Sequence, residues 1–106
     1  MSVQLSDDLL ETTNRGVAAL VLLELIPDWE FWTVIGWTRA EMAAILPLQN
    51  PLDDEKVVMA SVAFGNLLGY PHRKMADVEF SMQRNVQQIR DANETLLALS
   101  YRDRNH

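Results

Sequence analysis

The chain has 106 residues, of which 48% are hydrophobic and 23% charged, and its 15 acidic and 9 basic side chains give a net charge of −6. A chain of this length buries enough surface for one hydrophobic core, so we expect residues 1–106 to form a single helical domain. The hydrophobic fraction excludes an intrinsically disordered chain. The absence of cysteine excludes disulfide bonds, thiolate metal sites and a cysteine nucleophile.

The start of the chain and its most apolar stretch give no sign of export or of a membrane segment. Residues 1–8 contain two acids and no base, unlike a secretory signal or a transit peptide. The stretch 17–26 has about half of the ~20 residues that cross a bilayer, contains Glu24 and is followed by Pro27. We therefore expect a chain that does not enter a membrane and that has a cytoplasmic location.

The first helix is predicted to begin after Ser6. Serine is a favourable N-cap, two acids follow it, and Leu5 and Leu10 have the spacing of a hydrophobic staple. Apolar positions then keep a helical period until Pro27, which ends the helix. Residues 12–16 are weak helix formers, and they leave open whether this helix is broken there.

The segment 28–37 is rich in aromatic and β-branched residues, which suit a strand as well as a helix. A strand needs a partner, and no other segment of the chain has a convincing strand pattern. We therefore expect a short helix that is capped by Asp28 and ends at Gly36.

The next two helices have clear start signals. Thr38 and Glu41 have the spacing of a capping box, and the helix that they open ends at Pro47. Asp53 is the predicted cap of the following helix, at 54–68. That helix is apolar on nearly every side, which is typical of a helix in the middle of a bundle or at an oligomer interface.

The last helix is predicted to run from residue 72 or 73 to about residue 100, a length of roughly 40 Å. One face carries a stripe with alternating steps of three and four, and Asn85 is a candidate register-setting residue within it. Self-association through Asn85, Ile89, Leu96 and Leu99 is one interpretation, and coverage of the stripe by the other helices is the alternative. The stripe consists of Met75, Val78, Met82, Asn85, Ile89, Ala92, Leu96 and Leu99. The expected fold is an all-α bundle of four to five helices with a long C-terminal helix.

Half of the eight aromatic residues, including every tryptophan, lie within nine residues of one another. They are Trp29, Phe31, Trp32 and Trp37. A helical projection places Trp29 and Trp32 on one face and Phe31 on another. Either all four fill the core, or one face is an exposed aromatic patch that anchors a partner.

The sequence contains no constellation typical of a catalytic or metal site. The two histidines have no partner at ligand spacing, there is no Gly-x-Ser-x-Gly segment, and the glycines do not form a phosphate-binding loop. Glu24 and His72 are the mild candidates for a titrating group. We expect no enzymatic activity, no cofactor and no metal.

The segment Thr38 to Leu46 resembles the first helix of a helix-turn-helix, a resemblance that covers nine residues. The following turn departs from that motif, because residues 47–51 contain two prolines where the motif has a short glycine turn. The next helix opens with three acids, which would repel phosphate. With an isoelectric point near 4.7, we expect no nucleic-acid partner, although a helix-turn-helix-like transcriptional regulator is the alternative function.

Charge is distributed unevenly along the chain. Residues 1–55 contain ten acids and two bases, a net charge of −8, whereas residues 56–106 contain five acids and seven bases, a net charge of +2. The acidic half would attract a basic partner. We therefore expect a non-enzymatic protein–protein interaction module. It is either a small intracellular homo-oligomeric adaptor, most simply a homodimer, or an acidic inhibitor or immunity-like protein.

Overall fold

Six helices and one pair of very short strands make up the computed structural model, which describes residues 2–104, with side chains described up to residue 101. The fold is all-α, as the sequence predicts. The strands β1 (Ser2–Val3) and β2 (Leu52–Asp53) pair antiparallel, with Val3 opposite Leu52. The helices are α1 (Asp7–Leu22), α2 (Asp28–Ile35), α3 (Arg39–Ala44), α4 (Asp54–Gly69), α5 (Met75–Met82) and α6 (Val86–Arg104).

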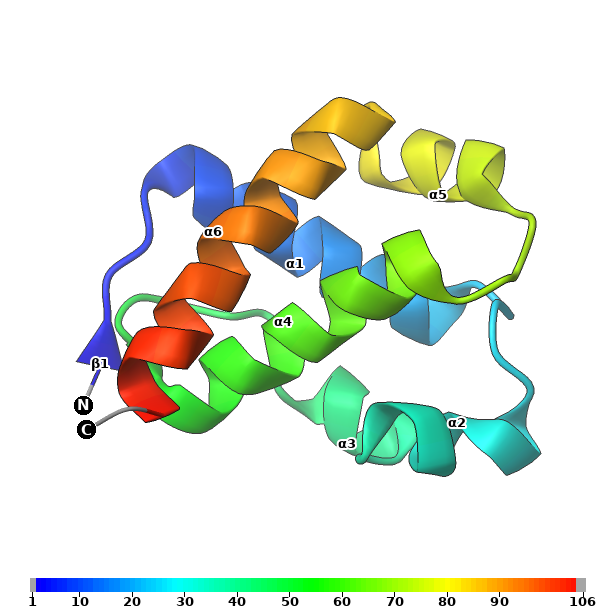
Figure 1. Ribbon diagram of the computed structural model, residues 1–106, viewed down its shortest axis with the longest axis horizontal. Coiled ribbons are helices and arrows are strands. Elements are labelled where there is room, and N and C mark those ends of the chain that lie inside the picture. The colour runs from blue at the N-terminus through cyan, green and yellow to red at the C-terminus, as the bar shows by residue number, and fades with distance from the viewer. Residues whose placement is uncertain (1, 105–106) are drawn as a thin grey trace.

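Helix α4 is the centre of the core. It packs against α1, α2, α5 and α6, and in Figure 1 it runs diagonally across the middle of the view, with α5 above it and α2 and α3 below. Val57, Ala60, Phe64 and Leu67 of this helix have no exposed surface. The apolar character of α4 on nearly every side is therefore explained by neighbours on several sides.

Three of the four predicted helix caps are present. Ser6 accepts a hydrogen bond from the amide of Leu9, and Asp53 accepts one from the amide of Lys56. Thr38 and Glu41 form the full capping box, with bonds of 2.9 and 3.0 Å in the two directions. The prediction for Asp28 is wrong, because Pro27 precedes the first turn of α2 and Asp28 is already helical.

Helix α1 is continuous through its weak helix formers but ends at Leu22, before Pro27. Its glycine, Gly16, lies where α1 crosses α4, and the ring of Phe64 packs directly on it. A Cβ atom at this position would lie 2.2 Å from Cε1 of Phe64. The close contact between the two helices therefore requires glycine. The packing that it permits offsets the low helix propensity of glycine.

The C-terminal helix α6 is long, with 19 residues, but it does not begin at residue 72 or 73 as predicted. The chain leaves the helical path at Gln83, which has a positive φ of 55°, and this divides the segment into α5 and α6. Asn85 lies at the joint between the two helices. Its side chain accepts a hydrogen bond from the amide of Gln88, and the side chain of Gln88 accepts one from the amide of Asn85, so this pair opens α6. Because of this break, the described residues form six helices, whereas four or five were expected.

Two asparagine side chains hold the loop between α3 and β2. Asn14 of α1 accepts a hydrogen bond from the amide of Leu48 at 2.6 Å and donates one to the carbonyl of Leu48 at 3.1 Å. Asn50 makes the same two kinds of bond with the backbone of Leu5, at 2.9 and 2.7 Å. Each amide thus pairs with a backbone as a neighbouring strand would, and Leu5 and Leu48 are held in the core.

We predict that Gly16→Ala lowers the free energy of unfolding by about 1–3 kcal/mol, because the added methyl group collides with the Phe64 ring. The matched control is Gly65→Ala in α4, where the space around the Cβ is open. That change should raise the free energy of unfolding by about 0.5–1 kcal/mol through helix propensity. Urea denaturation measures the free energy of unfolding of both variants, provided that its slope against urea concentration is unchanged. Equal effects of the two changes would contradict the packing argument.

Candidate functional site

The structure separates the aromatic cluster into buried and exposed members. Phe31 is 2% exposed and belongs to the core, and Trp37 is half-buried against it. Trp29 and Trp32, three residues apart on α2, are 82% and 63% exposed. The helical projection thus assigned the faces of α2 correctly, and the face that carries Trp29 and Trp32 lies outside the core.

A cleft opens beside Trp32, between the end of α1, helix α2 and helix α3. Its volume is about 560 Å³. Phe31 and Val21 form part of its apolar wall, and the exposed Trp32 stands at its edge. The remaining lining residues are Asp28, Thr38, Arg39, Ala40 and Ala43. We call this hollow, together with the exposed Trp29 and Trp32, the tryptophan cleft.

Arg39 of α3 fixes the walls of the cleft relative to one another. Its guanidinium donates hydrogen bonds to the carbonyls of Leu20 and Val21, at 3.2 and 3.0 Å, and to that of Ile26, at 2.9 Å. These carbonyls lie at the end of α1 and just after it, where a helix has unpaired acceptors and a partial negative charge. The same guanidinium lies 4.4 Å from the centre of the Phe31 ring.

Exposed carboxylates lie beside the cleft. Asp28 forms an ion pair with Arg39 at 3.0 Å while its own side chain remains 91% exposed. Glu24 is exposed and lines a second hollow that shares Asp28 and Arg39 with the cleft. The ammonium group of Lys74 lies 3.4 Å from the carbonyl of Glu24, so a second cation lies close to these carboxylates.

Tyr70 connects the tryptophan-bearing helix to the end of α4. Its hydroxyl donates a hydrogen bond to Oε2 of Glu30 at 2.7 Å. This hydrogen bond raises the pKa of Tyr70 above its ordinary value of 10.0, and desolvation and the negative charge of Glu30 act in the same direction. The contact ties the first turn of α2 to the end of α4.

The residues predicted to form a self-association seam lie mostly inside the molecule. Ile89 and Leu96 have no exposed surface, Leu99 is half-buried, and α6 packs closely along α4. Sequence analysis missed the exposed pair Leu97 and Tyr101 on another face of α6. They lie beside Val58, Ser61, Val62 and Gly65 of α4 in a hollow of about 260 Å³.

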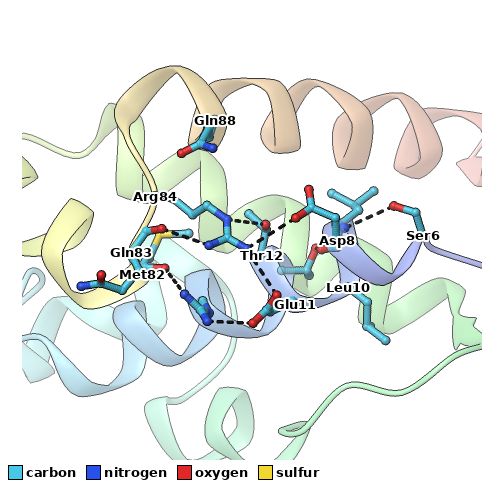
Figure 2. A network of polar contacts seen from close by, with 12 residues as sticks. Ser6, Asp8, Leu10, Glu11, Thr12, Met82, Gln83, Arg84 and Gln88 are labelled. Carbon is cyan, nitrogen blue, oxygen red and sulfur yellow. Dashed lines mark hydrogen bonds and ion pairs between the residues drawn. The ribbon is translucent and has the colours of Figure 1, made fainter.

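A polar network joins the start of α1 to the joint between α5 and α6 (Figure 2). Arg84, whose side chain is 14% exposed, donates hydrogen bonds to the hydroxyl of Thr12 and the carbonyl of Gln83, both at 3.0 Å. It also lies 3.6 Å from Asp8 and 3.5 Å from Glu11. No local sequence pattern predicts this network, because its partners are about 70 residues apart.

Glu24 and His72, the two candidate titrating groups, do not lie in a closed pocket. The side chain of Glu24 is exposed. His72 accepts a hydrogen bond at Nδ1 from the amide of Lys74 and lies with Nε2 2.8 Å from the carbonyl of Leu67, so it closes the end of α4. Within residues 2–104, no group of three or more acidic or histidine side chains is placed to hold a metal ion. In the same part of the chain, no helix is both long and apolar enough to span a bilayer.

Comparison with known proteins adds no assignment. No protein-family model matches the chain, and no curated protein or solved structure is similar to it at a level that indicates a relationship.

We predict that Arg39→Ala lowers the free energy of unfolding by about 2 kcal/mol or more, because three carbonyls lose their charged donor. The control is Asp28→Asn, which removes only an exposed ion pair and should cost less than about 1 kcal/mol. Chemical denaturation of both variants measures the difference. A cost for Asp28→Asn as large as that for Arg39→Ala would show that the ion pair, and not the carbonyl contacts, is what matters.

A second prediction concerns alkaline pH. Because the folded-state pKa of Tyr70 is raised, its contribution to stability is fully present below the unfolded pKa of about 10 and is lost as the pH rises through the folded pKa. In a Tyr101→Phe background, Tyr70 is the one remaining tyrosine, and ultraviolet absorbance follows its ionisation. Adding Glu30→Gln should lower the titration midpoint, and an unchanged midpoint would contradict the role of Glu30.

Proposed function

We propose that this chain is a non-enzymatic protein-interaction module that uses the tryptophan cleft to bind a basic, amphipathic helix of another protein. In this proposal it acts as an adaptor or as an acidic inhibitor of a basic partner. The observation that carries the proposal is the exposure of Trp29 and Trp32 beside an apolar cleft.

The exposed tryptophans support binding, because burying the large apolar surface of an indole ring releases much free energy. Tryptophan is the residue type most enriched among the side chains that dominate binding energy at protein interfaces. Large apolar side chains that are exposed together and have polar neighbours mark interaction surfaces. Trp29 and Trp32 are neighbours on one helical face, so a partner helix can cover both at once.

The shape of the site supports a partner that inserts an apolar side chain. Helix α2 ends at Ile35, before Gly36, which has a φ of 89°. Its first turn is held by Arg39, which pairs with Asp28, and by Tyr70, which donates a hydrogen bond to Glu30. A site that is already rigid loses little conformational freedom on binding, which favours affinity. The cleft, walled by Phe31 and Val21, accepts a leucine or a similar side chain of the partner.

Charge supports a basic partner. Asp28 and Glu24 place exposed carboxylates beside the cleft, while the guanidinium of Arg39 is directed to carbonyls at and after the end of α1. Lysine and arginine side chains of a partner would meet these carboxylates and the faces of the exposed indoles. Complementary charge of this kind chiefly raises the rate of association.

The alternative, a transcriptional regulator, needs a basic surface that includes Arg39 and Arg84. Both guanidiniums are instead engaged with α1, Arg39 at its end and Arg84 with Thr12 and nearby carboxylates. No specific observation favours the regulator, so the protein-interaction proposal is preferred. The cytoplasmic location stays a prediction from the sequence.

The experiment is a calorimetric titration with a synthetic amphipathic helix that has leucine on one face and lysine and arginine on the other. We expect saturable binding, with a dissociation constant raised at least about tenfold by Trp29→Ala/Trp32→Ala. The matched control is Phe80→Ala, which removes an equally exposed aromatic side chain from α5. It should leave the dissociation constant unchanged.

Two further arms make the titration decisive. The same peptide with glutamate in place of its basic residues should bind much more weakly, because exposed carboxylates lie beside the cleft. Absence of binding by the basic peptide would overturn the proposal. So would binding that survives the double tryptophan substitution, or binding that Phe80→Ala weakens as strongly.

A further inference from the structure

The sequence of the last third of the chain favours one uninterrupted helix. From Met75 to Arg104 it contains neither glycine nor proline, and apolar residues keep a helical spacing across the joint, from Met82 to Val86 and Ile89. Glutamine and arginine, at positions 83 and 84, are good helix formers. Asn85 is the residue of the joint that favours a helix start, because it caps α6 together with Gln88. The left-handed turn at Gln83 itself is not caused by a residue that disfavours a helix.

The backbone at the break is in a costly conformation. Gln83 has φ 55° and ψ 42°, the left-handed region that side chains with a Cβ atom disfavour and that glycine usually occupies at helix ends. A continuous helix would relieve this conformation. The local preference of Gln83 and its conformation in the fold thus oppose one another.

Contacts with α1 hold the bend in place. Arg15 donates a hydrogen bond to the carbonyl of Met82 at 3.0 Å and pairs with Glu11 at 2.7 Å. Arg84, labelled in Figure 2, donates hydrogen bonds to the carbonyl of Gln83 and the hydroxyl of Thr12. Both arginines therefore clamp the joint to the same helix. These contacts are polar and partly exposed, so a modest change can release them.

A straightened helix would not fit on its own molecule. Thirty residues from Met75 to Arg104 would extend about 45 Å at 1.5 Å per residue, whereas the longest dimension of the molecule is 35 Å. With α5 still in place, α6 would leave α4 and expose Ile89 and Leu96, which are now fully buried. The surface with the matching shape is the vacated face of α4 in a second copy of this chain.

We propose that residues 83–85 are a hinge through which two copies of this chain exchange α6. In the exchanged dimer, α5 and α6 form one helix, and the α6 of each copy packs on the α4 of the other. The contacts of Ile89 and Leu96 are remade between copies, and the strained backbone of Gln83 is relieved. Exchange of an identical element is a common route to dimers, and short strained hinges favour it. This inference does not depend on the tryptophan cleft.

The first test compares two substitutions at the hinge, refolded over a range of chain concentrations and analysed by light scattering after size exclusion. Gln83→Gly favours the bend and disfavours a helix, so this variant should remain monomeric. Gln83→Ala favours the continuous helix, so this variant should dimerise. The dissociation constant of its dimer should be at least about tenfold lower than that of the unmodified chain. Adding Arg84→Ala, which removes one clamp, should strengthen the dimer further. Equal masses for all variants at every concentration would overturn the proposal.

The second test distinguishes exchange from simple contact between surfaces. Gly65 and Leu97 are exposed on α4 and α6 and line the same hollow, and the chain has no cysteine of its own. With Gly65→Cys/Leu97→Cys added to the Gln83→Ala variant, a short bis-maleimide should link the thiols within one chain in the monomer fraction. In the dimer fraction it should link two chains on a denaturing gel. Links confined to single chains in the dimer would show that α6 has not been exchanged.

Discussion

The close crossing of α1 and α4, where the Phe64 ring packs on Gly16, is the contact on which the other elements depend. Because position 16 has no side chain, the ring fills the space between the two helices without a void. Helix α6 then packs on α4, while α3 and α5 pack chiefly on α1. A bulkier residue at this crossing would separate the two helices and loosen every layer added to them.

Arginine side chains organise both ends of α1. Arg39 satisfies the carbonyls at its C-terminal end, which has no basic residue of its own, and Arg15 and Arg84 tie its N-terminal half to the α5–α6 joint. Three of the nine basic residues are thereby engaged in internal contacts. Each of the three also forms an ion pair with a more exposed carboxylate, so arginine links the backbone of the core to acids on the surface.

Features set by neighbouring residues could be predicted from the sequence, and features set by distant residues could not. The caps at Ser6, Thr38 and Asp53 depend on residues three positions apart, and each is present. The pair of Asn85 and Gln88 that opens α6 has the same spacing. The contacts of Arg15 and Arg84 that hold the joint on α1 connect residues about 70 positions apart, and no local pattern indicates them. The separation of the aromatic cluster into Phe31 inside and Trp29 and Trp32 outside follows from how α2 lies on the core. The helical projection defined these two faces but not which of them is buried.

The exposure of Trp29 and Trp32 also determines which events the tryptophan fluorescence of this protein can detect. Indole fluorescence moves to shorter wavelength when the ring passes from water into apolar surroundings. Two of the three tryptophans already face water in the folded chain, and Trp37 is only half-buried, so unfolding changes their surroundings little. Coverage by another molecule changes them much more. The chain therefore carries a natural optical sensor for occupancy of its surface, and a poor one for its own folding.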